Sequence, residues 1–228
     1  MSYTLYIGNK NYSSWSMRPW IVMQHFAIPF EEKWIHFDNF DKNSKFKQTV
    51  LTFNPFGCVP FLVVDDFVIT DSLAICEYLA EQHSALALWP TDIKQRAQAR
   101  SLTAHMHTGY QKIRQYLPFN IEAQLPEIGK IILRDHLPVK KEIEFLDNLL
   151  SRYLKRSQGN YLFGNFTIAD AFYAPLCLRL KNYQIQVSDD LLKYIQTLCS
   201  THGITQWIDA ALKEHHFVAI DEPYRFSR

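Results

Sequence analysis

The chain has 228 residues, of which 47% are hydrophobic and 21% are charged, a composition typical of a soluble globular protein. Lys and Arg number 24 and Asp and Glu 23, so no excess charge favours binding to nucleic acid or to a membrane surface. The N-terminus lacks the pattern of a signal peptide. The four cysteines form no CxxC pair and have no metal-ligand spacing. We therefore expect a cytoplasmic protein with reduced thiols and no metal site.

The first third of the chain alternates strand and helix patterns. Strands are predicted at residues 3–7, 31–37, 61–64 and 67–69, and helices at residues 15–26 and 42–51 and after Asp71. Asp65 and Asp66 separate the last two strands as a hairpin, and Asp71 and Ser72 cap the helix that follows. The order βαβαββα predicts a thioredoxin-like α/β domain.

Beyond Pro90 the strand patterns nearly vanish and helical periodicity dominates, which predicts an all-α bundle. We place the boundary between Gln82 and Asp92, giving domains at residues 1–83 and 92–228. The helices of the second domain are predicted at residues 92–117, 138–156, 167–181, 188–200 and 203–214.

Two features near the hairpin suit a peptide that carries a carboxylate. Pro60 opens a strand, where it has no N–H to donate; if the Val59–Pro60 bond is cis, the backbone of Val59 turns outward and pairs with an extended peptide. A simple strand-start proline is the alternative. Asp71 and Ser72 begin a helix whose N-terminus suits an anion, and ordinary capping by Asp71 is compatible with binding by Ser72.

The stretch VPFLVVDDFVITDSLAICEYL resembles the glutathione-binding segment of cytosolic glutathione transferases. The resemblance implies that Val59 pairs with the cysteinyl backbone of glutathione and that Ser72 binds the γ-glutamyl carboxylate. Asp71 stands where the family more often has Glu or Gln for the γ-glutamyl ammonium. Thr167 and Asp170 have capping-box spacing and resemble the family's conserved helix start in the helical domain.

The segment between the first strand and the first helix contains three serines. Pro19 fits the first helical turn, which predicts an N-cap near Ser16 and leaves Ser13 and Ser14 in the loop. The segment resembles serine-type transferases, in which a hydroxyl here donates to the glutathione sulfur. Ser14 is the first candidate and Ser13 the second, with Asn11 a distant third. Arg18 is interpreted as structural.

The predicted substrate pocket draws on the helical domain. His107, Tyr110 and Arg114 share a face, which resembles the beta-class helix that faces the electrophile, and Arg179 is a further candidate. Packed or solvated side chains are the alternative at each position. Cys58 lies beside Val59 and has two interpretations, a mixed disulfide with glutathione or a buried inert thiol.

The resemblance implies a glutathione S-transferase that conjugates glutathione, its co-substrate, to small hydrophobic electrophiles, and a homodimer. One alternative is a zeta-like isomerase that adds glutathione transiently to a cis double bond. Another is a non-catalytic adaptor of the same fold, like the bacterial stringent-starvation proteins that bind RNA polymerase. Residues 11–17 contain no cysteine, which disfavours a redox role like that of glutaredoxins.

Overall fold

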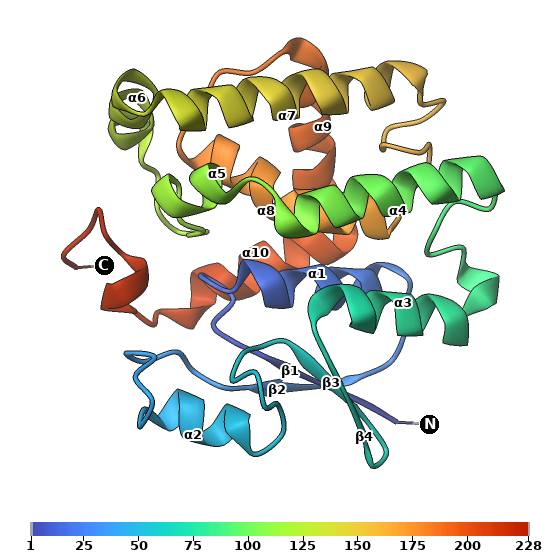
Figure 1. The fold of residues 1–228 in the computed structure, drawn as a ribbon, viewed down its shortest axis with the longest axis vertical. Helices are drawn as coiled ribbons and strands as arrows, with labels where there is room; N and C mark the ends of the chain where they lie inside the picture. Colours follow the sequence, from blue (N-terminus) through green and yellow to red (C-terminus); the bar gives the residue numbers. More distant parts are fainter. Residues whose placement is uncertain (1, 228) are drawn as a thin grey trace.

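The computed structural model describes residues 2–227 and contains a mixed sheet covered by helices (Figure 1). The strands are β1 (Tyr3–Ile7), β2 (Glu31–Trp34), β3 (Phe61–Val64) and β4 (Phe67–Thr70). Their order is β2-β1-β3-β4; β1 is parallel to β2 and antiparallel to β3, and β3 is antiparallel to β4. The predicted βαβαββα order and the thioredoxin-like fold are confirmed.

Three helices flank the sheet. Helices α1 (Ser14–His25) and α3 (Ser72–Gln82) lie on one face and α2 (Lys45–Leu51) lies on the other (Figure 1). The α2 side has its own small apolar cluster, formed by Ile35, Phe46, Val50 and Phe61. On the opposite side, α1 packs against α8 and α10 as well as the sheet, so one continuous core joins the sheet layer to the helical layer.

The remaining helices form the second layer. They are α4 (Ile93–Thr108), α5 (Gln111–Tyr116), α6 (Pro126–Asp135), α7 (Leu137–Arg156), α8 (Ile168–Asn182), α9 (Asp189–Ser200) and α10 (His202–Glu214). The predicted all-helical character of this region is confirmed. The exact domain limits, residues 1–83 and 92–228, stay a prediction. No helix within residues 2–227 is long and apolar enough to cross a membrane.

The predicted start of the first helix was wrong. The N-cap is Ser13, not Ser16, because the Ser13 hydroxyl accepts a hydrogen bond from the backbone N–H of Ser16 at 3.4 Å. Pro19 therefore lies inside α1 and not in its first turn. The helix continues through it, although the proline nitrogen cannot donate to the preceding turn. The strand predicted at residues 31–37 is also shorter, since β2 ends at Trp34.

The predicted helix at residues 92–117 is two helices. The chain leaves α4 at Gly109, and Tyr110 takes a left-handed conformation with φ 57° before α5 begins. The guanidinium of Arg114 fills the break: it donates to the carbonyls of Gly109 at 3.0 Å and Met106 at 2.5 Å. These are carbonyls that a continuous helix would pair internally, so the side chain of Arg114 replaces those bonds. Helix α6 was not predicted.

The predicted capping box of α8 is confirmed. The carboxylate of Asp170 accepts from the backbone N–H of Thr167 at 2.8 Å and of Leu162 at 3.0 Å, and from the Tyr194 hydroxyl at 2.8 Å. All four residues are buried. Thr167, Asp170 and Tyr194 belong to the helical layer, and Leu162 lies in the loop that leads to α8. Asp170 thereby holds the start of α8, the helix that reaches α1.

Candidate functional site

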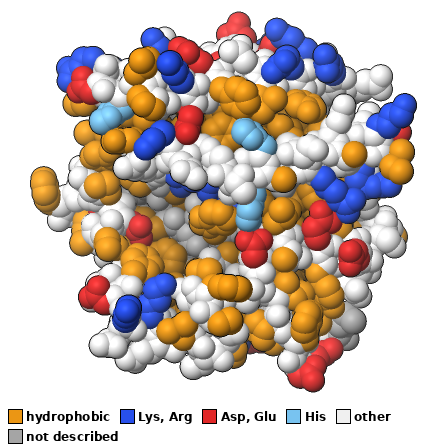
Figure 2. Space-filling view, in the orientation of Figure 1, with side chains coloured by type: hydrophobic (Ala, Val, Ile, Leu, Met, Phe, Trp, Pro, Cys, Tyr) orange, Lys and Arg blue, Asp and Glu red, His pale blue; other side chains and the backbone are white. Residues whose placement is uncertain are grey.

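A cavity of about 240 Å³ opens where the start of α1, the loop before β3 and the C-terminal segment meet. It contains three residues on which the site depends: Ser14, Val59 and Asp221. The other lining residues are Tyr12, Ser13, Trp15, Phe37, Phe40, Phe46, Lys47, Gly57 and Cys58. Figure 2 shows this face of the molecule hollowed between the helical layer and the sheet layer, with Lys or Arg side chains at the edge of the hollow.

The two candidate serines have different hydrogen-bond partners. Ser13 is the N-cap of α1, and its hydroxyl also donates to the Ser16 hydroxyl at 2.7 Å. Ser14 is the first residue of the helix, and its Oγ accepts from Nη2 of Arg179 at 3.4 Å. An oxygen that accepts from a guanidinium keeps its own proton available for another acceptor. The geometry therefore favours Ser14 as the hydroxyl donor to a ligand in the cavity.

The predicted peptide clamp lies on the adjacent side. The Val59–Pro60 bond is cis, as predicted. Asp71 is the N-cap of α3: its Oδ1 accepts from the backbone N–H of Leu73 at 2.7 Å, and its backbone has a φ of 80°. Ser72, the first residue of α3, is buried and its Oγ accepts from Nη1 of Arg18 at 3.4 Å.

Arg18, His107 and Asp71 form a hydrogen-bonded chain between the two layers. Nη1 of Arg18 lies 3.3 Å from Nδ1 of His107, and Nε2 of His107 lies 3.1 Å from Oδ2 of Asp71. Because Arg18 has only donors, Nδ1 of His107 is its acceptor, and Nε2 of His107 is the donor to Asp71. Burial raises the pKa of Asp71, but hydrogen bonds from His107 and from the start of α3 outweigh it and hold that pKa below its ordinary value.

Three arginines gather beside the cavity. Arg18 is fully buried, and burial followed by repulsion from Arg114 and Arg179 lowers its pKa well below the usual range. Burial and then Arg114 lower the pKa of Arg179 to about 9. Nε and Nη2 of Arg18 are buried and have no hydrogen-bond partner among the described residues. A group of cations with unused donors is an anion-binding arrangement.

Trp15 connects these arginines to the cavity that it lines. The guanidinium of Arg18 stacks 3.8 Å from the centre of its ring, and that of Arg114 lies 5.0 Å away. The rings of His107 and Trp15 are nearly perpendicular, with 5.0 Å between their centroids. Cation–π attraction of this kind contributes about 2 kcal/mol when the cation is desolvated, which offsets part of the repulsion within the cluster.

Asp221 enters the cavity from the C-terminal 3-10 turn η2 (Ala219–Asp221). Burial, with a smaller contribution from Glu222, raises the pKa of Asp221 to about 6. Its Oδ2 is buried and makes no hydrogen bond within residues 2–227. The segment is fastened by the Tyr12 hydroxyl, which donates to Oε1 of Glu222 at 2.7 Å.

The structure does not bring every predicted residue to this site. Tyr110 packs against Phe145 and Tyr173 inside the helical layer and does not line the cavity. Arg114 reaches the site only through Trp15, since its donors bind α4 carbonyls. The thiol of Cys58, for which a buried position was one interpretation, is exposed and lines the cavity.

Sequence reasoning missed Arg18 and Asp221 as site residues. The spacing of Arg18 after Ser14 places it one turn along the same helix, so its proximity to the serine was visible, but its burial against Ser72 and His107 depends on tertiary packing. No local pattern marks Asp221, which arrives from a segment about 200 residues away in the chain.

Comparisons with known proteins add to this geometry. Residues 12–82 match the family model described as Glutathione S-transferase, N-terminal domain. Over 186 residues, 81% of each chain, the sequence is 30% identical to the Caenorhabditis elegans protein named "Probable maleylacetoacetate isomerase". Over 173 residues, 75% of this chain and 74% of the other, it is 32% identical to Glutathione S-transferase 1 of Dianthus caryophyllus.

A solved structure has the same fold. The crystal structure of a glutathione transferase homologue from Burkholderia, with bound glutathione, superposes with a TM-score of 0.69. The similarity covers 93% of this chain and 99% of that chain, at 24% sequence identity.

Proposed function

Because the chain belongs to the glutathione S-transferase family and is a glutathione-dependent enzyme, we propose that it ionises glutathione beside Ser14 and transfers the thiolate to a small electrophile. Val59 pairs with the cysteinyl backbone, and Ser72 and Asp71 hold the γ-glutamyl end. The thiol loses its proton to solvent. The thiolate sulfur then forms a bond to the electrophilic carbon, the bond from that carbon to its leaving group breaks, and the leaving group departs to solvent with the electron pair of that bond.

One observation carries the proposal. Ser14 is the first residue of α1, and it lines the cavity and accepts a hydrogen bond from Nη2 of Arg179 at 3.4 Å. A free thiol of pKa about 8.5 is only a few per cent ionised at neutral pH, so the enzyme must stabilise the thiolate. A donor hydroxyl, the partial positive charge at the start of α1 and the guanidinium all favour the anion.

The test is calorimetric titration with glutathione followed by a pH titration of the bound thiol. We expect one glutathione per chain and a bound thiol pKa about two units below that of free glutathione, a preference of about 2.7 kcal/mol for the thiolate. Absence of glutathione binding would contradict the proposal and would favour the non-catalytic adaptor. Binding without a shifted thiol pKa would contradict the role of Ser14.

The arginine cluster supports a second candidate reaction. Arg18, Arg114 and Arg179 place positive charge beside the cavity, so the site suits an electrophile that carries a carboxylate. The C. elegans relative is named for maleylacetoacetate, a cis-unsaturated dicarboxylate. In an isomerisation of this type the thiolate adds to the double bond, the adduct rotates about the resulting single bond, and the thiolate leaves.

Glutathione consumption distinguishes the two reactions. Conjugation consumes one glutathione for each product, whereas isomerisation regenerates it. The enzyme is assayed with maleylacetoacetate and with 1-chloro-2,4-dinitrobenzene, and free thiol is counted after the reaction. Turnover of maleylacetoacetate with constant thiol would establish the isomerase, and turnover of the aryl chloride with falling thiol the transferase.

The expected homodimer and the cytoplasmic location also remain proposals. The family resemblance supports a two-fold dimer in which the sheet layer of one chain meets the helical layer of the other. Sedimentation at micromolar concentration tests it, and a monomer would contradict it.

A further inference from the structure

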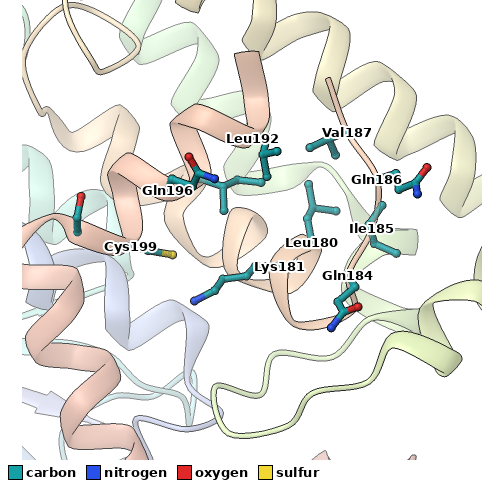
Figure 3. Close-up of a pocket in the computed structure, with 11 residues that line it drawn as sticks. Leu180, Lys181, Gln184, Ile185, Gln186, Val187, Leu192, Gln196 and Cys199 are labelled. Carbon is teal, nitrogen blue, oxygen red and sulfur yellow. The ribbon is translucent and has the colours of Figure 1, made fainter. Parts of the chain in front are cut away.

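Two cavities of the molecule differ in one chemical respect. The larger is an open cavity of about 750 Å³ between the end of α8, the loop that follows and α9 (Figure 3). Apolar side chains and amides make up most of its wall, and none of the described residues that line it is Asp or Glu. The cavity at Ser14, in contrast, contains the carboxyl group of Asp221. A carboxylic acid that is able to exchange a proton with a reactant is therefore found beside Ser14 and not in the larger cavity.

The carboxyl group of Asp221 has an acceptor that the fold does not use. Its Oδ2 is buried and has no hydrogen-bond partner within residues 2–227. An unpartnered buried carboxyl oxygen costs free energy, and a catalytic role is one of the reasons for which folded proteins retain such a group.

The position of Asp221 is fixed through Tyr12, which lies two residues before Ser14. The Tyr12 hydroxyl donates to Oε1 of Glu222 at 2.7 Å and accepts from the backbone N–H of Val218 at 3.4 Å. Asp221 lies between these two anchor points, and its own N–H donates to the carbonyl of Val218 at 2.9 Å. The turn that carries the carboxyl group is therefore tied to the loop that leads to Ser14.

The other titratable side chains along the described wall of this cavity are those of Tyr12, Lys47 and Cys58. The hydroxyl of Tyr12 already donates to Glu222, and burial followed by that hydrogen bond raises the pKa of Tyr12 to about 12. The ammonium of Lys47 donates to a backbone carbonyl at 2.6 Å. A thiol is ordinarily a weaker acid than a carboxyl group, so Asp221 is a better proton donor than Cys58.

A thiolate in the same cavity favours the protonated form of Asp221. Burial, and then Glu222, raise the pKa of Asp221 to about 6, and a negative sulfur nearby raises it further because like charges repel. When the sulfur is ionised, the two groups therefore share one proton, and the carboxyl group holds it. The cavity then contains a nucleophile beside an acid.

Addition to a conjugated double bond requires such an acid, whereas substitution does not. A thiolate that adds to an α,β-unsaturated carbonyl compound leaves a negative charge on the product, and a proton must neutralise it. A thiolate that displaces a halide leaves no charge on the product, because the halide carries the charge away.

We propose that Asp221 is a further catalytic residue, the general acid that protonates an α,β-unsaturated carbonyl compound as the glutathione thiolate adds to it. This inference rests on the proposed reaction of glutathione at Ser14. The sulfur forms a bond to the β-carbon, and the electron pair of the double bond moves to the α-carbon and takes the proton of Asp221. The Asp221 carboxylate then regains a proton from solvent, which received one from the thiol. One glutathione and one electrophile give one adduct.

The experiment compares two electrophiles in wild type and Asp221→Asn at pH 6.5. Addition to trans-4-phenyl-3-buten-2-one, an enone, requires a proton at carbon, and substitution of 1-chloro-2,4-dinitrobenzene does not. Asp221→Asn is expected to lower kcat/KM for the enone about 100-fold, since general acid catalysis contributes about 10²–10⁴-fold. The same variant is expected to raise kcat/KM for the aryl chloride by up to about twofold, because removal of the negative charge leaves more of the bound thiol ionised.

Two further variants identify the carboxyl group as the donor. Asp221→Glu keeps the acid and is expected to retain at least about a tenth of the wild-type kcat/KM for the enone. Asp209→Asn removes an exposed carboxylate from α10, outside the cavity, and is expected to change neither reaction.

Equal changes of the two reactions in Asp221→Asn would overturn the proposal, because they would assign Asp221 to the shape of the site or to the thiol. Loss of the enone reaction in Cys58→Ser, with no loss in Asp221→Asn, would assign the proton to the Cys58 thiol and would also overturn it. A wild-type enzyme that conjugates the aryl chloride but not the enone would overturn this inference and leave the proposed function intact. An enzyme that binds no glutathione would overturn both.

Discussion

The guanidinium of Arg179 donates to the hydroxyl of Ser14 across the boundary between the sheet layer and the helical layer, at 3.4 Å. Two backbone carbonyls hold the guanidinium of Arg179 in place. Its Nε donates to the carbonyl of Leu117 at 2.9 Å, and its Nη1 donates to that of Pro175 at 3.3 Å. The cation is therefore held in place beside the hydroxyl, and the helical layer supplies part of the field acting on whatever Ser14 binds.

We predict that Arg179→Met raises the pKa of the bound glutathione thiol. A unit charge about 6 Å from the sulfur contributes at most about 3 kcal/mol at an effective dielectric of about 20, and water in the open cavity reduces this. A rise of about one pKa unit is expected. The measurement is a pH titration of the thiolate absorbance in the far ultraviolet.

Two further variants make that result specific. Arg179→Lys keeps the charge and is expected to recover most of the shift. Lys181→Met removes a positive charge two residues along the same helix and is expected to leave the thiol pKa unchanged. A thiol pKa that is equal in wild type and Arg179→Met would show that Arg179 has only a structural role.

Substitutions of the two serines at the start of α1 are predicted to have different effects. Ser13→Ala removes the N-cap and is expected to lower the free energy of unfolding by about 1 kcal/mol, with no change in the thiol pKa. Ser14→Ala is expected to raise the thiol pKa by about one to two units, because one charge-assisted hydrogen bond is lost. Denaturant unfolding and thiolate titration of both variants are compared. A thiol shift in Ser13→Ala alone would move the assignment to Ser13.

The sheet layer was largely predictable and the break in the first long helix was not. Local patterns predict β1, β3 and β4, because β1 is a short run of β-favouring residues and Asp65 and Asp66 mark the turn between β3 and β4. The break at Gly109 and Tyr110 depends on the guanidinium of Arg114, which takes over the carbonyls left unpaired. A side chain from the next helix supplies that compensation, and the hydrophobic periodicity of residues 92–117 does not reveal it.

Part of the candidate site was likewise predictable from the sequence, and part of it was not. Ser14, Val59 and Ser72 were predicted because each follows a local rule, a helix start or a strand-opening proline. Arg18 was interpreted as structural, since sequence alone does not reveal that two of its nitrogens are buried without partners. Burial and partners of a charged side chain are properties of the tertiary fold, so the electrostatics of the site required coordinates.

Ser72→Ala is predicted to weaken glutathione binding about tenfold to a hundredfold. The Ser72 hydroxyl is buried and linked to Arg18 at 3.4 Å, so its loss removes a hydrogen bond to the γ-glutamyl carboxylate and leaves the guanidinium with one partner fewer. Calorimetry measures the dissociation constant, with the exposed Ser84→Ala as the control. An unchanged constant in Ser72→Ala would place the carboxylate elsewhere.

Asp170→Ala is predicted to be strongly destabilising without touching the site. It leaves the N–H groups of Leu162 and Thr167 and the hydroxyl of Tyr194 without their acceptor in the buried helical layer. Each lost partner contributes about 1 kcal/mol, so a decrease of about 3–4 kcal/mol in the free energy of unfolding is expected. Asp189→Ala, an exposed residue in the first turn of α9, should lower it by less than about 1 kcal/mol. Similar losses in the two variants would show that the carboxylate of Asp170 is not required as an acceptor.

Asp221→Asn is predicted to change how stability depends on pH. The folded pKa of Asp221 is about 6, above the ordinary value of about 3.9 in an unfolded chain, so the folded state holds the proton more tightly. This contribution is fully present below the unfolded pKa and is lost as pH rises through the folded pKa. Between pH about 4 and about 7 the wild type should therefore lose about 2 kcal/mol relative to Asp221→Asn. Denaturant unfolding across that range measures the difference, and parallel curves would contradict the prediction.

The same substitution should act on the thiol in the opposite direction to Arg179→Met. Above pH about 6 the Asp221 carboxylate is charged, and it lines the same cavity as Ser14. A negative charge near the sulfur disfavours the thiolate, so Asp221→Asn is expected to lower the pKa of the bound thiol, by up to about one unit in an open cavity. Thiolate titration at pH values above 6 measures this change in the thiol pKa. Glu222→Gln is not a suitable control, because Glu222 holds the C-terminal segment in place through its hydrogen bond with Tyr12. A raised thiol pKa in Asp221→Asn would mean that the carboxyl acts as a proton donor to the sulfur, and the repulsion argued above would be wrong.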